Sequence, residues 1–454
     1  MREAGLDQIA VAASQLDGAE PRVDEPAPLE LPSDARDALG AALLLSFATA
    51  IPQRVQLAVP LMLVAFVVAW RATRAPRPSR IGWGGAYAAL AAMATMPLFL
   101  PLPTPSLPAF VWGARLFPWL AVPLVGLHAA ANDRWRPRVL WALVIPALSL
   151  QLLVVHDFAH PVIDVWSWTQ FEAQTVLAGV HPYTVVAPDV YQGGFHYGYT
   201  TAIYQYLPAD ILFAIPGYAL GGDYRYSLVA CNVATILLAR AAGRRLGAAP
   251  RLVDVVTLAL ALHPRGAWMI AHGWTEPFLC VCLAAFVYAE ARAPGGPLSS
   301  VAFLMLPALK QYFFAPTLIY LATRPRLRSL AVGMAVAALT VVPFLAWNAR
   351  ATLDGILWVV KTPPFRDDSL SLSALVAAVT GWRWGKLPGM LSQLIAGGVA
   401  FALLRQRGVG GLLLASALAL FASFLTAPQA FLNYYFFVST LLLAASLVLA
   451  RRCE

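Results

Sequence analysis

Long runs of hydrocarbon side chains recur along the whole chain and limit what it can fold into. The longest runs are Leu57–Trp70, Val139–Val155, Leu330–Trp347, Gly411–Thr426 and Phe436–Ala450. They approach the length of about 20 apolar residues with which a helix crosses a bilayer. Only 12% of the 454 residues are charged, whereas a soluble domain carries about 25%. We therefore expect an all-α integral membrane protein whose spans form a multi-span helical bundle.

Arginine clusters between the apolar runs indicate which loops face the cytoplasm. The clusters lie at 71–80, 134–138, 240–251, 324–328, 405–407 and 451–452. Cytoplasmic loops retain Lys and Arg, and placing every cluster inside requires about 14 membrane segments. The predicted segments are 38–52, 54–70, 83–100, 108–129, 138–155, 225–241, 253–271, 275–291, 298–326 (two short helices), 329–347, 387–404, 409–426 and 431–449.

The stretch from Val139 to Tyr224 contains no Lys or Arg but several acids, which is typical of an outer loop. We predict an outer loop at 156–223, with a helix-like run around WSWTQFEAQTVLAG and a second helix at 201–222 lying in the interface. The prolines and glycines of the second helix disfavour a clean span. Lys310, between the two short helices of 298–326, is predicted to point into a cavity open to the outer face. The reason is that irregular backbone at membrane depth is tolerated where it lines a cavity.

The two ends of the chain differ in composition from its middle. Residues 1–37 hold nine acids against three arginines, which predicts a mobile acidic cytosolic tail. N-terminal membrane spans at 38–137 and a membrane core at 138–454 follow it. We expect both termini in the cytoplasm and, from the Ala- and Arg-rich usage, a bacterial plasma (inner) membrane. The net charge of +9 is explained by cytoplasmic loops, so no nucleic-acid partner is expected.

Several segments resemble, in their order, the GT-C superfamily of membrane glycosyltransferases. They are the outer loop with its Asp and Gly-x-x-Pro-Tyr, YQYLPADILFAIPG (204–217), HGWTEP (272–277), LPALKQYFFAPTLIYLATRPR (306–326) and RDDSLSLSAL (366–375). The last is similar to a segment of the polyprenol-phosphate-mannose-dependent α-mannosyltransferases, glycosyltransferase family 87. The resemblance implies that 138–454 is the catalytic core of a GT-C-like bundle with outer-face juxtamembrane helices. It also implies a hexosyltransferase with its active site facing outside or the periplasm. The implied partners are a polyprenyl-phosphate sugar donor, with mannose as the family's sugar, and a lipid or glycan acceptor.

Such a transfer needs a carboxylate that takes the acceptor proton as general base, and positive charge or donors for the departing phosphate. Asp164 is the candidate base and Asp157 the second candidate. The alternative is that both carboxylates only start or solvate an interfacial helix. Lys310 is costly at membrane depth, which favours a role in substrate binding, unless its ammonium snorkels to the interface.

The remaining substrate-binding candidates are polar residues predicted at the same outer face. They are Glu276, His272, Arg265, Arg366 and Tyr183. The alternative for Glu276 is an acid that starts a helix. For Arg366 it is an ion pair with Asp367 or Asp368, and for Tyr183 it is an interface anchor.

Three alternatives are weighed at this stage. His156 and His160 would share one helix face and could bind a divalent metal, but no third ligand is evident, so no cofactor is predicted. A polytopic transporter or lipid-sugar flippase would also be a membrane bundle, although such proteins tend to show internal repeats and this chain shows none. A non-catalytic scaffold would leave Lys310 and the outer acids unexplained.

Overall fold

The structure is a computed structural model that describes residues 30–51, 55–80, 82–99, 108–190, 204–361 and 365–451. Most of the described chain is helical and its strands are short, which confirms the all-α prediction. Its strands are β1 (Glu30–Pro32) and β2 (Pro78–Arg80), which pair antiparallel with Glu30 opposite Arg80. Most of the predicted tail, residues 1–29, falls outside the described residues.

The helices follow the predicted segments closely. The first half of the chain forms α2 (Ser33–Ala50), α3 (Val55–Arg71), α4 (Trp83–Thr95), η1 (Met96–Leu98), α5 (Pro108–Ala130), α6 (Arg136–Asp157), α7 (Asp164–Leu177), η2 (Pro182–Thr184), α8 (Pro208–Gly221) and α9 (Arg225–Arg245). The second half forms α10 (Pro250–Ala261), α11 (Gly266–Ala271), α12 (Glu276–Arg292), α13 (Pro297–Leu309), η3 (Gln311–Phe313), α14 (Phe314–Ala322), α15 (Leu327–Lys361), α16 (Leu372–Thr380), α17 (Leu387–Leu404), η4 (Arg405–Arg407), α18 (Gly408–Thr426) and α19 (Leu432–Leu449).

Two predicted boundaries are wrong. The first helix begins at Ser33, inside the segment predicted as a tail, because Asp34 is buried and its carboxylate accepts a hydrogen bond of 2.8 Å from Arg407. The predicted span 253–271 is broken, since α10 ends at Ala261 and α11 begins at Gly266. The break contains Pro264, whose ring cannot be accommodated in a helix interior without disruption.

Several helices are suited to a membrane. Five helical segments are long and apolar enough to cross one: Arg136–Asp157, Arg225–Arg245, Leu327–Leu357, Leu387–Thr426 and Leu432–Leu449. Large apolar side chains also face outward, with Trp119 70% and Leu339 68% exposed. Extensive apolar surface of this kind is rare on soluble monomers. The protein therefore has the features of an integral membrane protein, as predicted.

Small residues let these helices approach closely. A Cβ atom on Gly243 of α9 would lie 2.9 Å from Val253 of α10, and one on Gly333 of α15 would lie 2.8 Å from the backbone of Ser300 in α13. Close backbone approach at small residues is a common way of packing helices in lipid. The bundle thus gains tight packing without large side chains at these crossings.

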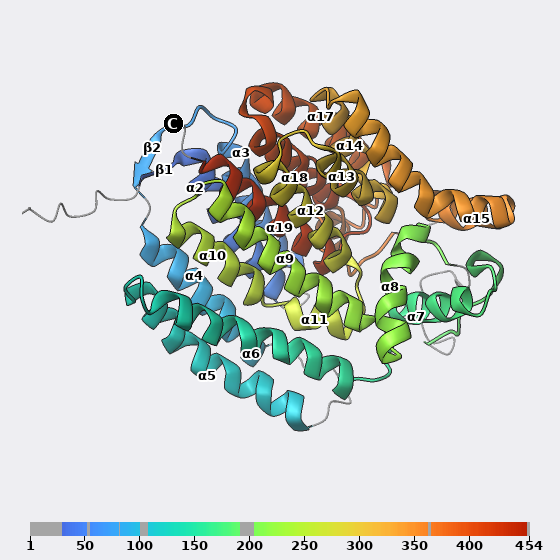
Figure 1. Ribbon diagram of the computed structural model, residues 1–454, viewed down its shortest axis with the longest axis horizontal. Helices are drawn as coiled ribbons and strands as arrows, with labels where there is room; N and C mark the ends of the chain where they lie inside the picture. The colour runs from blue at the N-terminus through green and yellow to red at the C-terminus, as the bar shows by residue number, and fades with distance from the viewer. Residues whose placement is uncertain are drawn as a thin grey trace, which may run out of the picture.

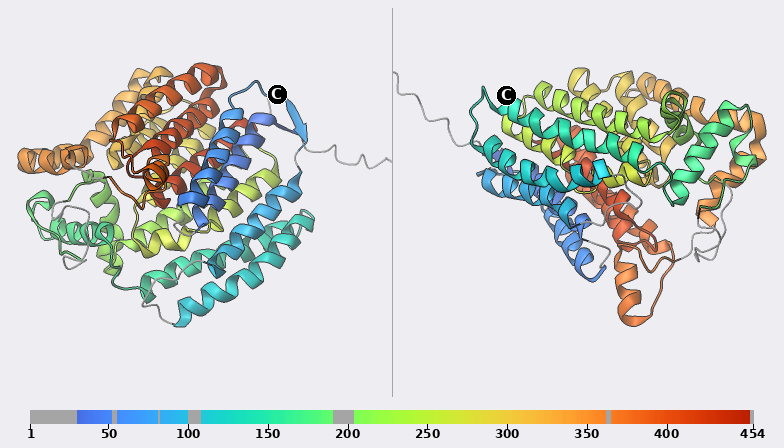
Figure 2. Two further views of the ribbon diagram at one scale, coloured as in Figure 1. Left: turned by 180° about the vertical axis from the view of Figure 1, so that it is seen from behind. Right: turned by 90° about the horizontal axis from the view of Figure 1, so that it is seen from below.

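The bundle has two chemically different ends, which Figure 1 shows on opposite sides of the molecule. We call the end that holds β1, β2, the C-terminus and the loop around Arg407 the arginine end. There Arg407 also donates to the backbone oxygen of Ala72 at 2.8 Å, and a Cβ atom on Gly410 would touch Leu449. We call the end that holds α7, α8 and the starts of α9, α12 and α19 the acidic end. The rotated views of Figure 2 show the same separation.

Candidate functional site

Lys310 lies at the acidic end, in the break between α13 and η3. Its backbone is extended, with φ −139° and ψ 129°, so two short helices meet at this residue as the sequence predicts. The side chain is only 5% exposed. Its ammonium lies 3.8 Å from the centre of the Tyr206 ring, a geometry in which a cation is attracted to the ring face. A lysine is thus held away from water inside the bundle.

Two fully buried carboxyl groups lie within electrostatic range of this lysine. Asp210 comes from the first turn of α8, and Tyr204 donates to its Oδ2 at 3.3 Å. Glu276 begins α12, and the amide nitrogen of Asn433 donates to its Oε1 at 2.8 Å. Burial raises the pKa of Asp210, while the Lys310 charge lowers it. We call Tyr206, Asp210, Glu276, Lys310 and Asn433 the Lys310 cluster.

Asp164 begins α7 beside this cluster. Its Oδ1 accepts the Val165 backbone N–H at 2.8 Å, so it does help to start the helix, as one reading of the sequence expects. Burial raises the pKa of the Tyr206 phenol well above its ordinary value, and the charge of Asp164 raises it further. The charges of Asp210 and Glu276 also raise the pKa of this phenol. The structure therefore brings Asp164, Glu276 and Lys310 together around one tyrosine.

Three other predicted site residues have defined partners at the acidic end. The Asp157 carboxylate contacts His156 Nδ1 at 3.0 Å, at the last turn of α6. His272 lies between two indoles, with ring centres 4.4 Å from Trp268 and 5.0 Å from Trp274. Tyr183 donates its hydroxyl to the backbone oxygen of Tyr206 at 2.6 Å. Tyr183 therefore orients the segment that carries Tyr206.

Two predicted arginines are engaged in other contacts. Arg366 forms a two-pronged ion pair with Asp368, both contacts 2.7 Å long, which is the alternative that the sequence left open. Arg265 is 2% exposed and donates to the backbone oxygen of Thr49 at 3.0 Å. That oxygen belongs to the last turn of α2, where helix carbonyls lack partners. The contact ties α2 to the break between α10 and α11, so Arg265 has a structural role here.

Sequence reasoning missed Asp210 and Asn433. In the sequence, Asp210 was considered only as a residue that disfavours a membrane span. An acid two residues after Pro208 in an apolar segment also indicates a candidate functional residue. Asn433 stands out only as an amide at the start of an apolar helix. A third residue, Glu172 of α7, is fully buried and neither of its oxygens has a hydrogen-bond partner in the described part of the chain. Burial raises its pKa to about 9.

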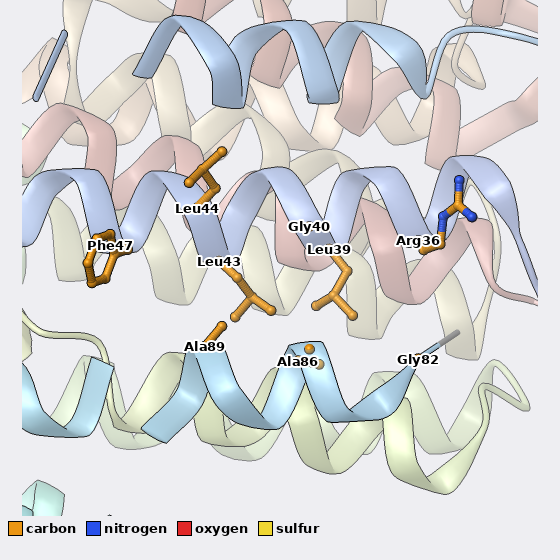
Figure 3. Close-up of a pocket in the computed structure, with 10 residues that line it drawn as sticks. Arg36, Leu39, Gly40, Leu43, Leu44, Phe47, Gly82, Ala86 and Ala89 are labelled. Carbon is orange, nitrogen blue, oxygen red and sulfur yellow. The ribbon is translucent and has the colours of Figure 1, made fainter. Parts of the chain in front are cut away.

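A separate cavity of about 340 Å³ lies between α2 and α4. Figure 3 shows its wall of Leu39, Leu43 and Phe47 facing the small residues of α4. Its charged lining residue, Arg36, is already paired with Asp37 at 3.0 Å. Because this apolar groove lacks convergent polar groups that could orient a substrate, it is not the candidate site.

In the described ranges, no group of three or more His, Cys, Asp and Glu side chains is arranged to hold a metal ion. His156 is paired with Asp157, and the His160 ring packs against Trp166 with centres 6.2 Å apart. Comparisons with known proteins find no matching family, no similar curated protein and no solved structure of similar fold.

Proposed function

We propose that this protein is a membrane glycosyltransferase. It moves a sugar, mannose in the first instance, from a polyprenyl-phosphate donor to a lipid or glycan acceptor. The observation that carries the proposal is the meeting of Asp164, Glu276 and Lys310 around Tyr206. Perturbed ionisable groups gathered in one buried place are characteristic of functional sites.

The chemistry needs one group to accept a proton and others to hold the substrates. Asp164 is half-buried at the edge of the cluster, so its carboxylate can meet an acceptor hydroxyl arriving from outside the bundle. We assign it as the general base. Direct displacement at the anomeric carbon inverts its configuration, so a β-linked donor gives an α-linked product. The buried members of the cluster then hold the sugar.

The membrane arrangement that fits this function follows the two ends of the bundle. Loops rich in Arg are retained in the cytoplasm, which puts the arginine end and both termini inside. The acidic end then faces the outside or periplasm, with α7 and α8 as juxtamembrane helices of a GT-C-like bundle of about 14 membrane segments. The membrane is the bacterial plasma (inner) membrane.

One feature favours a second function, a polytopic transporter or lipid-sugar flippase. Buried ionisable groups inside a membrane protein also mark transport pathways. Farther along the bundle, Asn232 of α9 donates to the side chain of Gln151 in α6 at 2.9 Å, so buried polar contacts are not confined to the acidic end. A transporter would move a lipid-linked sugar across the membrane without transferring it.

The test is transfer of a radiolabelled sugar from a polyprenyl-phosphate donor into membrane lipid or glycan. Membranes carry wild type, Asp164→Asn or the control Asp354→Asn at matched expression. Asp354 is a suitable control because its side chain is 65% exposed and pairs only loosely with Arg350, at 3.9 Å. Loss of a general base typically costs at least about 100-fold in rate.

We expect transfer by wild type and by the control, and a fall of at least about 100-fold in Asp164→Asn. Retained transfer in Asp164→Asn would move the base to Asp157 or another carboxylate. Movement of labelled lipid across vesicles without transfer to any acceptor would replace the transferase with the transporter.

A further inference from the structure

The Lys310 cluster presents more buried hydrogen-bonding atoms than its own contacts satisfy. Asp210 Oδ1, Glu276 Oε2 and Asn433 Oδ1 accept no hydrogen bond from the described residues. The hydroxyl of Tyr312 is unpartnered in the same sense, whereas the hydroxyl of Thr275 interacts with the carboxyl group of Asp210. In folded proteins the large majority of buried polar side-chain atoms have a protein or water partner. The concentration of exceptions at one place therefore indicates a group that binds there.

These atoms belong to separate elements that converge. Asp210 is on α8, Thr275 directly precedes α12, Tyr312 is on η3 and Asn433 is in the first turn of α19. The bond from Asn433 to Glu276 joins residues 157 apart in sequence. Asn433 is 8% exposed and Thr275 is 1% exposed, so water has little access to them. The convergence is a property of the fold and not of one helix end.

The charges of this place do not suit an anion. Lys310 faces the carboxyl groups of Asp210 and Glu276, and Asp164 adds a further negative charge nearby. Burial raises the pKa of Asp210 and the Lys310 charge opposes that rise, so the cation of this cluster already interacts with a carboxyl group. A phosphate or a sugar acid would have to compete with these carboxyl groups for the one ammonium, in a place where water is largely excluded. Uncharged hydroxyl groups, which both donate and accept, match a set of mixed donors and acceptors.

We propose that the Lys310 cluster is the sugar subsite and that it selects an uncharged, hydroxyl-rich sugar over a sugar acid or a bare phosphate. The inference rests on the proposed function for the identity of the donor and deepens it by naming the class of sugar. Lys310 donates to sugar hydroxyls, while Glu276, Asp210 and Asn433 accept from them. Lys310 therefore does not hold the departing phosphate.

The experiment measures binding and needs no acceptor. Purified protein in nanodiscs is titrated with one polyprenyl phosphate in three forms: bare, carrying mannose, and carrying mannuronic acid. The variants are Lys310→Met, Glu276→Gln and the control Glu290→Gln. Glu290 suits the comparison because it lies at the other end of α12, where it accepts the Gly295 N–H at 3.1 Å.

We expect wild type and Glu290→Gln to bind the mannose-bearing lipid at least about tenfold more tightly than either other form. Glu276→Gln and Lys310→Met should lose that preference but keep the affinity for the bare lipid. Equal binding of all three forms would mean that the buried atoms hold water only, and would overturn the inference. So would weaker binding of the bare lipid by Lys310→Met, since that result would make Lys310 a phosphate ligand.

The same measurements separate this inference from the transferase itself. Selective binding of the mannose-bearing lipid without transfer to any acceptor would overturn the proposed function and support the subsite. Transfer without selective binding would overturn the subsite and leave the transferase.

Discussion

The arginine end and the acidic end both bury charged groups, but they treat them differently. At the arginine end, Arg240 donates to Asp254 at 2.5 Å, and Arg407 reaches the buried Asp34 at 2.8 Å. At the acidic end, oxygens of Asp210 and Glu276 have no hydrogen-bond partner among the described residues. The buried ion pairs of the arginine end stabilise the fold, whereas the unpartnered oxygens of the acidic end are typical of a binding site.

The physical reason lies in the cost of burying charge. A buried ion pair is tolerable when both partners are present, but it leaves a costly uncompensated charge when one is removed. Asp254 also meets His128 at 3.6 Å, and His128 contacts the hydroxyl of Tyr87 at 3.1 Å. These contacts fasten α4 and α5 to α9 and α10.

The acidic end has one comparable pair, since the buried Arg225 contacts Asp223 at 2.6 Å. It differs in that it also keeps buried carboxylate oxygens of Asp210 and Glu276 without a hydrogen-bond partner among the described residues, which a fold selected for stability alone would not do.

The largest effect on stability is expected at the arginine end. Asp254→Ala leaves Arg240 buried without its carboxylate, which should destabilise the protein by about 3–5 kcal/mol. Thermal unfolding in nanodiscs measures the loss. Asp133→Ala is the control, because Asp133 pairs with Arg136 at the same end but is 94% exposed. Equal melting temperatures for the two variants would contradict the structural role of the buried pair.

At the acidic end, substitution of a buried carboxylate should affect binding more than stability. Asp210→Asn keeps the side-chain shape and removes a carboxylate with one unpartnered oxygen. We expect stability within about 1 kcal/mol of wild type and a loss of sugar binding of at least about tenfold. A variant that unfolds while its remaining folded fraction binds normally would show that Asp210 is structural.

The pH dependence of the melting temperature should depend on Glu172. Its folded pKa of about 9 lies above the ordinary value of 4.5 because of burial. The protonated carboxyl group therefore contributes to the free energy of unfolding. This contribution is fully present below about pH 4.5 and is lost as the pH rises toward 9. The melting temperature of wild type should fall over this range more steeply than that of Glu172→Gln. Parallel profiles would show that Glu172 is ionised in the folded protein.

The smallest effect is expected for an exposed charge pair that is neither a buried ion pair nor part of the Lys310 cluster. Arg350 and Asp354 are 3.9 Å apart, with side chains 94% and 65% exposed. Exposed pairs of this kind contribute little, so Arg350→Ala should leave melting temperature, sugar binding and transfer unchanged. A measurable loss of binding would extend the site to the part of α15 that carries Arg350.

Much of the secondary structure could be predicted, because apolar runs, prolines and arginine clusters act locally. The break at Lys310 was predicted from the charge pattern alone. The break at Pro264 was missed because the apolar run 253–271 outweighed a single proline in that reading.

The ion pair of Arg366 was one of two alternatives open from its neighbours Asp367 and Asp368, and the structure selects it. The role of Arg265 could not be predicted, because its partner Thr49 lies 216 residues away in the sequence.

Hydropathy and charge along the sequence are enough to predict a helical membrane protein with arginine-rich loops and a stretch at 139–224 that holds acids but no Lys or Arg. These properties follow from hydropathy and charge along the chain, which do not depend on how the helices pack. The gathering of Asp210, Asn433 and Tyr206 around Glu276 and Lys310, in contrast, depends on how the helices pack. Helix packing brings Asn433 to Glu276 across 157 residues, and no local pattern specifies such a meeting.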